Sequence, residues 1–99
     1  MDEVPTRKFA EAHAKAVVDG AMDSVTNDFI PDLRGQVSDI ATQLPQPVEN
    51  ATVKRVDVED DHATVEIEYS NETQSLRIRT RWEEVDGRPM IVDGAPVED

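Results

Sequence analysis

The sequence contains no cysteine, and this absence excludes several kinds of site. Disulfide bridges, thiolate metal centres and cysteine nucleophiles all require a thiol. The chain also lacks any apolar run near the roughly 20 residues that a membrane-spanning helix needs. Residues 1–5 are acidic and have no apolar stretch of the kind found in secretion signals, so we expect a cytoplasmic protein.

Aromatic side chains and positive charge are also scarce. The aromatic residues are Phe9, Phe29, Tyr69 and Trp82, so the core must consist mainly of Val, Ile, Leu and Ala. The formal net charge of −12 opposes binding to nucleic acid and to anionic membrane surfaces, and we expect neither partner. A length of 99 residues suits one domain with one core.

The first half of the chain has the periodicity of helices. After a frayed tail at residues 1–4, apolar positions recur at helical spacing over residues 5–19. Two more helices are predicted over residues 21–30 and 31–44, because Pro31 interrupts the pattern and prolines follow Leu44.

The second half changes to the period of two that is typical of strands. The predicted strands cover residues 53–59, 62–70, 74–85 and 88–97. Odd positions within 63–69 and even positions within 76–82 place mainly apolar side chains on one face, and charged side chains occupy the other. Asp86-Gly87 is a strong signal for a tight turn before the last strand.

The register of the second hairpin is open between two alternatives of equal parity. A turn centred on residues 72–73 places Tyr69 opposite Leu76, and Glu68 opposite Arg77. A turn centred on residues 71–72 shifts these pairs but keeps the apolar face intact. In both cases the helices have no other surface on which to bury their apolar stripes. We therefore predict an α+β fold with three N-terminal helices on one face of a four-stranded antiparallel meander.

The order of these elements resembles the nuclear transport factor 2-like superfamily, also called SnoaL-like. The resemblance lies in residues 81–94, with an aromatic strand, an Asp-Gly turn and an Ile-Val-Asp return strand, and in the helical opening over residues 9–30. It implies a cone-shaped domain with a pocket at the wide end, and frequent homodimers. A strand often found before the third helix has no counterpart around residues 28–35, which implies a small pocket or none. No catalytic pair of the family can be matched to this sequence.

His13, Tyr69 and Trp82 are the candidate ligand-binding residues, and His13 is also the candidate catalytic residue. His13 lies in the apolar stripe of the first helix, and a histidine can donate or accept a proton near neutral pH. Tyr69 and Trp82 alternate onto the same face of the sheet, where their rings can stack on an apolar ligand. The simpler interpretation is that all three residues are core residues with satisfied hydrogen bonds.

Other charged residues have a structural explanation that competes with a functional one. Asp28, Asp32 and Asp93 are candidate carboxylates at the mouth of a pocket, although helix capping explains them as well. Residues 59–62 combine acidic and histidine side chains, but adjacent residues in a turn diverge, so we expect no metal site. We expect no other cofactor.

A row of arginines lies on the charged face of the predicted sheet. It consists of Arg77, Arg79 and Arg81. These side chains can bind an anion, pair with the facing glutamates, or form part of a symmetric dimer interface.

The sequence supports a small ligand-binding or assembly domain, expected to be a homodimer that accepts an apolar ligand. One alternative is an isomerase or dehydratase in which His13 or a pocket aspartate transfers a proton. Another is an acidic inhibitor or immunity-type protein that binds a basic partner. The residues alone do not choose among these functions.

Overall fold

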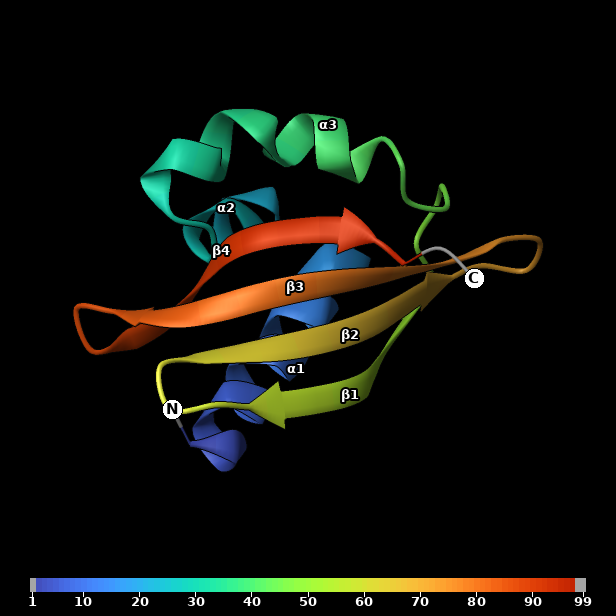
Figure 1. Cartoon of the computed structure of the whole chain (residues 1–99). Coiled ribbons are helices and arrows are strands. Elements are labelled where there is room, and N and C mark those ends of the chain that lie inside the picture. Colours follow the sequence, from blue (N-terminus) through green and yellow to red (C-terminus); the bar gives the residue numbers. More distant parts are fainter. Residues whose placement is uncertain (1, 98–99) are drawn as a thin grey trace.

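A computed structural model describes residues 2–97 and shows helices packed against one antiparallel sheet (Figure 1). The first helix, α1, spans Glu3–Asp19 and ends where Gly20 adopts a left-handed φ of 72°. The expected tail at residues 1–4 is therefore wrong at positions 3 and 4, which are helical. The N–H and the hydroxyl of Thr6 both donate to the carbonyl of Asp2, at 3.2 and 2.7 Å, and this closes the first turn, which contains Pro5. Met1 lies outside the described residues.

The second helix, α2, spans Met22–Asn27 and is shorter than the predicted 21–30. Residues 28–30 leave the helix to pair with the last strand. Ile91 N–H donates to Asp28 O at 2.7 Å, and Ile30 N–H donates to Ile91 O at 3.0 Å. These two bonds fix Asp28 and Phe29 beside the sheet.

The third predicted helix, over residues 31–44, forms as two short pieces. Pro31–Gln36 winds as a 3₁₀ helix, η1, and Val37–Ala41 forms α3. Gly35 lies in the first piece, where a glycine weakens an α-helix, and short connectors often adopt the tighter 3₁₀ winding.

The four strands form a meander in the order β1-β2-β3-β4, and all neighbours are antiparallel. Their bounds are Asn50–Val58, His62–Ser70, Ser75–Val85 and Arg88–Pro96. Tyr69 lies opposite Leu76 and Glu68 opposite Arg77, so the register is the one set by a turn at residues 72–73. Irregularities at Lys54 in β1 and at Val92 in β4 interrupt the pairing with the neighbouring strands.

The two faces of the sheet differ as the alternation predicts. The inner face buries Ala63, Val65, Ile67, Tyr69, Ile78, Thr80 and Trp82. The outer face carries charges, including an ion pair of 3.5 Å between Arg77 and Glu68. The predicted α+β class and the helix-covered meander are confirmed.

The helices cover the inner face unevenly. Figure 1 shows α1 running behind the sheet, whereas α2, η1 and α3 lie toward β4. None of the helices within residues 2–97 is long and apolar enough to cross a membrane.

Candidate functional site

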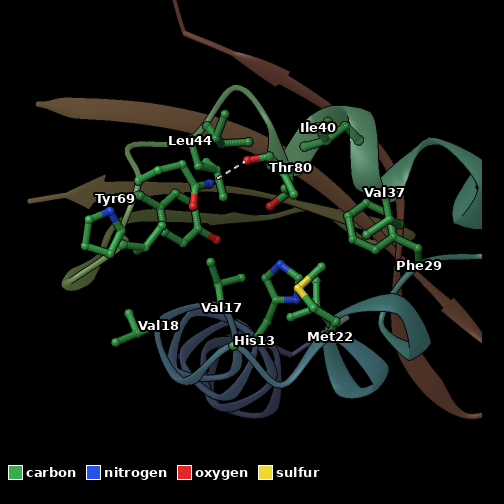
Figure 2. A pocket seen from close by; sticks show the side chains of 18 residues that line it. His13, Val17, Val18, Met22, Phe29, Val37, Ile40, Leu44, Tyr69 and Thr80 are labelled. Atoms are coloured by element: carbon green, nitrogen blue, oxygen red, sulfur yellow. Dashed lines mark hydrogen bonds between the residues drawn. The ribbon is translucent and has the colours of Figure 1, made fainter.

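A cavity of about 290 Å³ lies between the C-terminal half of α1, the segment from α2 to Val48, and the inner face of the sheet (Figure 2). Most of its lining is apolar. The apolar lining comes mainly from Val17, Val18, Met22, Val25, Phe29, Val37, Ile40, Leu44, Val48 and Ile78. The polar side chains in the wall are His13, Gln46, Tyr69 and Thr80. Such a combination, apolar walls with few polar groups, is typical of small-molecule sites.

His13 projects from α1 into this cavity (Figure 2) and is only 4% exposed. Its Nδ1 lies 2.8 Å from Oδ2 of Asp28. Its ring also makes edge contacts with Phe29 and Trp82, at centroid distances of 5.9 and 5.8 Å. The ring is therefore held on three sides, and its Nε2 has no hydrogen-bond partner among residues 2–97.

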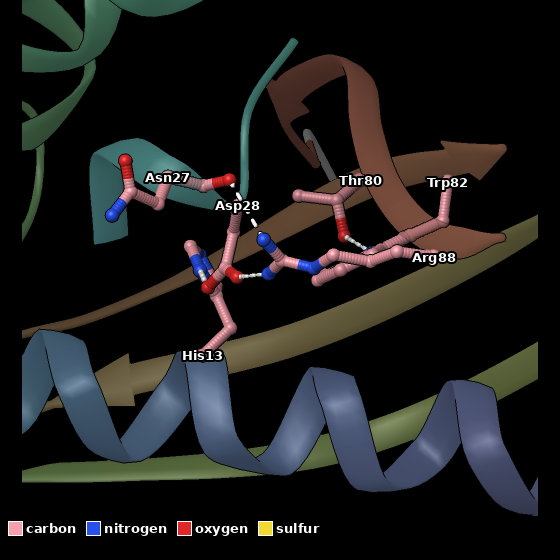
Figure 3. Close-up of polar contacts among 6 residues, drawn as sticks. All are labelled: His13, Asn27, Asp28, Thr80, Trp82 and Arg88. Atoms are coloured by element: carbon pink, nitrogen blue, oxygen red, sulfur yellow. Dashed lines mark hydrogen bonds and ion pairs between the residues drawn. The ribbon is translucent and has the colours of Figure 1, made fainter. Parts of the chain in front are cut away.

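Asp28 connects His13 to Arg88 (Figure 3). Nη2 of Arg88 donates to Oδ1 of Asp28, and Nη1 donates to the carbonyl of Asn27 at 3.1 Å. The guanidinium also lies 5.3 Å from the centre of the Phe9 ring, a cation–π distance. Arg88 thus joins the start of β4 to the end of α2 and to α1.

The hydrogen-bond network assigns the tautomer of His13. Arginine has only donors, so Arg88 favours the acceptor form of the Asp28 carboxylate. A carboxylate beside Nδ1 favours the tautomer that carries its proton there. In that tautomer, Nε2 of His13 is a hydrogen-bond acceptor facing the cavity.

Tyr69 forms another part of the cavity wall, at the far end of β2. It is almost fully buried, and its hydroxyl makes no hydrogen bond to any residue in the described range. Burial raises the pKa of the Tyr69 phenol, and the negative charge of Asp28 raises it further. The phenol therefore remains a neutral O–H donor throughout the physiological pH range.

Trp82 does not belong to the wall of the cavity. It is fully buried behind His13, and its Nε1 donates to Oγ1 of Thr80 at 2.9 Å. The Thr80 hydroxyl in turn donates to the carbonyl of Val65 at 3.2 Å. The indole N–H is thus already satisfied, and Trp82 supports His13 from the side away from the cavity.

Structural comparison finds solved structures with similar folds, among them the following two. A SEC-C motif-containing protein from Rhodopseudomonas palustris aligns with a TM-score of 0.68 and 16% identity, covering 91% of this chain and 77% of that one. A nuclear transport factor 2-like protein of unknown function from Burkholderia xenovorans aligns with a TM-score of 0.64 and 15% identity, covering 94% and 83%. The chain has a nuclear transport factor 2-like fold. No family model and no curated protein matches the sequence.

Within this nuclear transport factor 2-like fold, the three carboxylates that were predicted at the mouth of a pocket lie in different environments. Asp28 reaches the cavity-facing histidine, whereas Asp32 and Asp93 are exposed and absent from the cavity wall. No group of three or more potential metal ligands occurs within residues 2–97. In the acidic β1–β2 turn, a hydrogen bond from His62 lowers the pKa of Asp61, and this turn lies outside the cavity.

The role of Arg88 and the path of residues 31–48 along the cavity were not anticipated from the sequence. Arg88 follows the Asp86-Gly87 turn and is separated from Asp28 by 60 positions, so no local spacing connects the two residues. In the sequence, Arg88 stands out only by its position three residues before Ile91, which is fully buried in the structure. The cavity itself depends on the way residues 31–48 cross the fold, and sequence periodicity does not specify that path.

Proposed function

We propose that this protein binds a small, predominantly apolar molecule in the cavity next to His13 and Tyr69. The observation that carries the proposal is the cavity itself: its wall is apolar, and Nε2 of His13 and the Tyr69 hydroxyl make no hydrogen bond within residues 2–97. A purely structural core favours close packing, and a cavity of about 290 Å³ leaves its apolar wall with fewer packing contacts than a filled core has. Occupation by an apolar ligand restores those contacts.

Methyl-detected NMR with naphthalene as the probe tests this proposal. We expect shifts concentrated in the methyl groups that line the cavity, such as those of Val37, Ile40 and Leu44. Val17→Phe fills the cavity from α1 and should weaken binding by about tenfold or more. Val4→Phe is the matched control, because it makes the same change on an exposed part of the same helix.

The proposal fails if naphthalene leaves the lining methyl groups unshifted. It also fails if Val17→Phe and Val4→Phe bind the probe equally well. The first result would show that the probe does not enter the cavity, and the second that it binds elsewhere.

A proton-transfer enzyme is the second candidate, and the His13–Asp28 contact of 2.8 Å favours it. A carboxylate on Nδ1 orients the imidazole and leaves Nε2 to accept a proton from a bound substrate. The base-catalysed ring opening of 5-nitrobenzisoxazole is a suitable probe, because it requires only proton abstraction in an apolar site. We expect His13→Gln to lower its rate by about 10² or more. Equal rates for the protein and the variant would contradict this candidate.

We also propose that the protein forms a homodimer through the outer face of the sheet. Arg79 lies on this face and makes no ion pair with any residue in the described range, which leaves it available to a symmetric partner. Light scattering should give twice the chain mass, and Arg79→Glu should shift the equilibrium toward the monomer. A single-chain mass at high concentration would contradict the dimer.

A further inference from the structure

We infer that the cavity selects an uncharged aromatic molecule that carries a hydroxyl group. The inference rests on the proposed binding function and adds the chemical class of the ligand. Three separate properties of the cavity lead to it: the charge of its wall, the hydrogen-bonding state of its polar atoms, and its size and aromatic edges.

The charge of the wall excludes a charged ligand. No Asp, Glu, Lys or Arg side chain lines the cavity in the described part of the chain. Arg88 lies outside the cavity wall, and its two terminal nitrogens donate to Asp28 and to the carbonyl of Asn27, while its buried Nε has no partner within residues 2–97. A carboxylate or phosphate in the cavity would therefore lose its hydration without gaining an ion pair. The same argument applies to an ammonium group, because Asp28 is engaged by Arg88 and His13.

The polar atoms of the wall favour a hydroxyl group. Nε2 of His13 is an acceptor when Nδ1 carries the proton, and the Tyr69 phenol is a donor that has no partner within residues 2–97. A hydroxyl group donates one hydrogen bond and accepts others, so it complements both kinds of atom. An ether or a ketone lacks the donor that Nε2 requires.

The other polar side chains do not compete for this group. The Thr80 hydroxyl already accepts from Trp82 and donates to Val65. The amide nitrogen of Gln46 donates to the carbonyl of Ala41 at 3.1 Å, and Gln46 is exposed. The specific polar contact is thus confined to His13 and Tyr69.

The volume of the cavity and the aromatic side chains in its wall favour a ligand with a flat ring system. An engineered apolar cavity of about 150 Å³ accommodates benzene, and this cavity measures about 290 Å³. Two fused rings therefore fit the space better than one. His13, Phe29 and Tyr69 present aromatic rings to it, and ring edges and faces pack favourably against an aromatic ligand.

The experiment compares three probes of the same shape: naphthalene, 2-naphthol and 2-naphthoate. They differ only in having no polar group, a neutral hydroxyl group or an anionic carboxylate near neutral pH. We expect 2-naphthol to bind about tenfold more tightly than naphthalene, and 2-naphthoate to bind at least about tenfold more weakly than 2-naphthol. Calorimetry or fluorescence titration of the full chain measures all three affinities.

Tyr69→Phe removes one oxygen atom and keeps the ring. We expect the ratio of the 2-naphthol affinity to the naphthalene affinity, both measured on this variant, to fall to near one. His13→Gln keeps a group that can contact Asp28, and it should also reduce the preference. The circular dichroism spectrum and thermal unfolding of each variant show that it is folded, and the two affinities are compared within each variant.

The outcomes separate the two proposals. If naphthalene binds in the cavity as tightly as 2-naphthol, or if 2-naphthoate binds best, the inference is overturned and the binding function stands. If the 2-naphthol preference persists unchanged in Tyr69→Phe and His13→Gln, the inference is also overturned. If none of the three probes binds, the binding function and the inference both fail.

Discussion

The space beneath the sheet has a packed end, covered by α1, and a hollow end, covered by the C-terminal half of α1 together with short helical segments. At the packed end, around Trp82, the side chains of Ala10, Ala63 and Val65 are all 0% exposed. At the hollow end, around Tyr69, the inner face looks across the cavity toward Val37 and Leu44.

The difference follows from how closely each helix approaches the sheet. α1 is a regular helix of 17 residues, and the small side chains of Ala10 and Ala14 let it lie close to the strands. The cover of the hollow end is a six-residue 3₁₀ helix followed by a five-residue α-helix. Short elements of this kind contribute little packing of their own, so the cavity remains unfilled.

The largest expected effect is at the packed end. Trp82→Ala removes a fully buried indole that contacts His13 and bonds to Thr80, and it should lower the free energy of unfolding by about 3–5 kcal/mol. Urea denaturation followed by circular dichroism measures this loss. A loss below about 1 kcal/mol would show that the packed end is not closely packed.

The link between the two ends should show the next largest effect. Asp28→Ala leaves Arg88 and His13 without their shared partner, and we expect a loss of about 2–4 kcal/mol. The double variant Asp28→Ala with Arg88→Met should recover part of that loss, because it removes the orphaned charge. Fully additive losses in this double-mutant cycle would contradict the coupling.

A smaller effect is expected at the hollow end. Leu44→Ala truncates a half-buried side chain that already faces empty space, so the loss should be about 1 kcal/mol. Ile67→Ala is the comparison at a fully buried position of the sheet and should cost about 2–5 kcal/mol. Similar losses of stability for both variants would show that the two ends are equally well packed.

The last effect concerns pH and is absent near neutrality. The pKa of Tyr69 is raised in the folded protein, so the folded state keeps a proton that the unfolded chain releases above a pH of about 10. This residue should therefore reduce stability as the pH rises above about 10, by at most about 1.4 kcal/mol per pH unit, and should have no effect below it. Denaturation at a series of alkaline pH values measures the slope. Tyr69→Phe should flatten it, and an identical slope in the variant would refute the assignment.

The sheet could be predicted from the sequence because its signals are local. Alternation predicted the bounds of β2, His62–Ser70, and the apolar face of the sheet. It did not predict the register, because both alternatives pair a glutamate with Arg77, and the structure has the one that places Glu68 there. The end of α2 could not be predicted, because residues 28–30 follow a pairing with Ile91 that no short-range pattern indicates.

The same local sequence patterns predicted only part of the candidate site. Helical spacing predicted that His13 faces the sheet, and alternation predicted that Tyr69 and Trp82 lie on the same face of the sheet. The structure then places His13 and Tyr69 in the cavity wall and Trp82 behind His13. Arg88 was missed because its role depends on a contact over 60 positions.

The hollow end can be tested most directly by locating a bound apolar probe. Intermolecular nuclear Overhauser effects between naphthalene and the methyl groups of the protein measure its position. We predict contacts with Val17, Ile40 and Leu44, on opposite walls of the cavity, and none with the charged outer face of the sheet. Contacts confined to the outer face, or none to these three residues, would contradict the account.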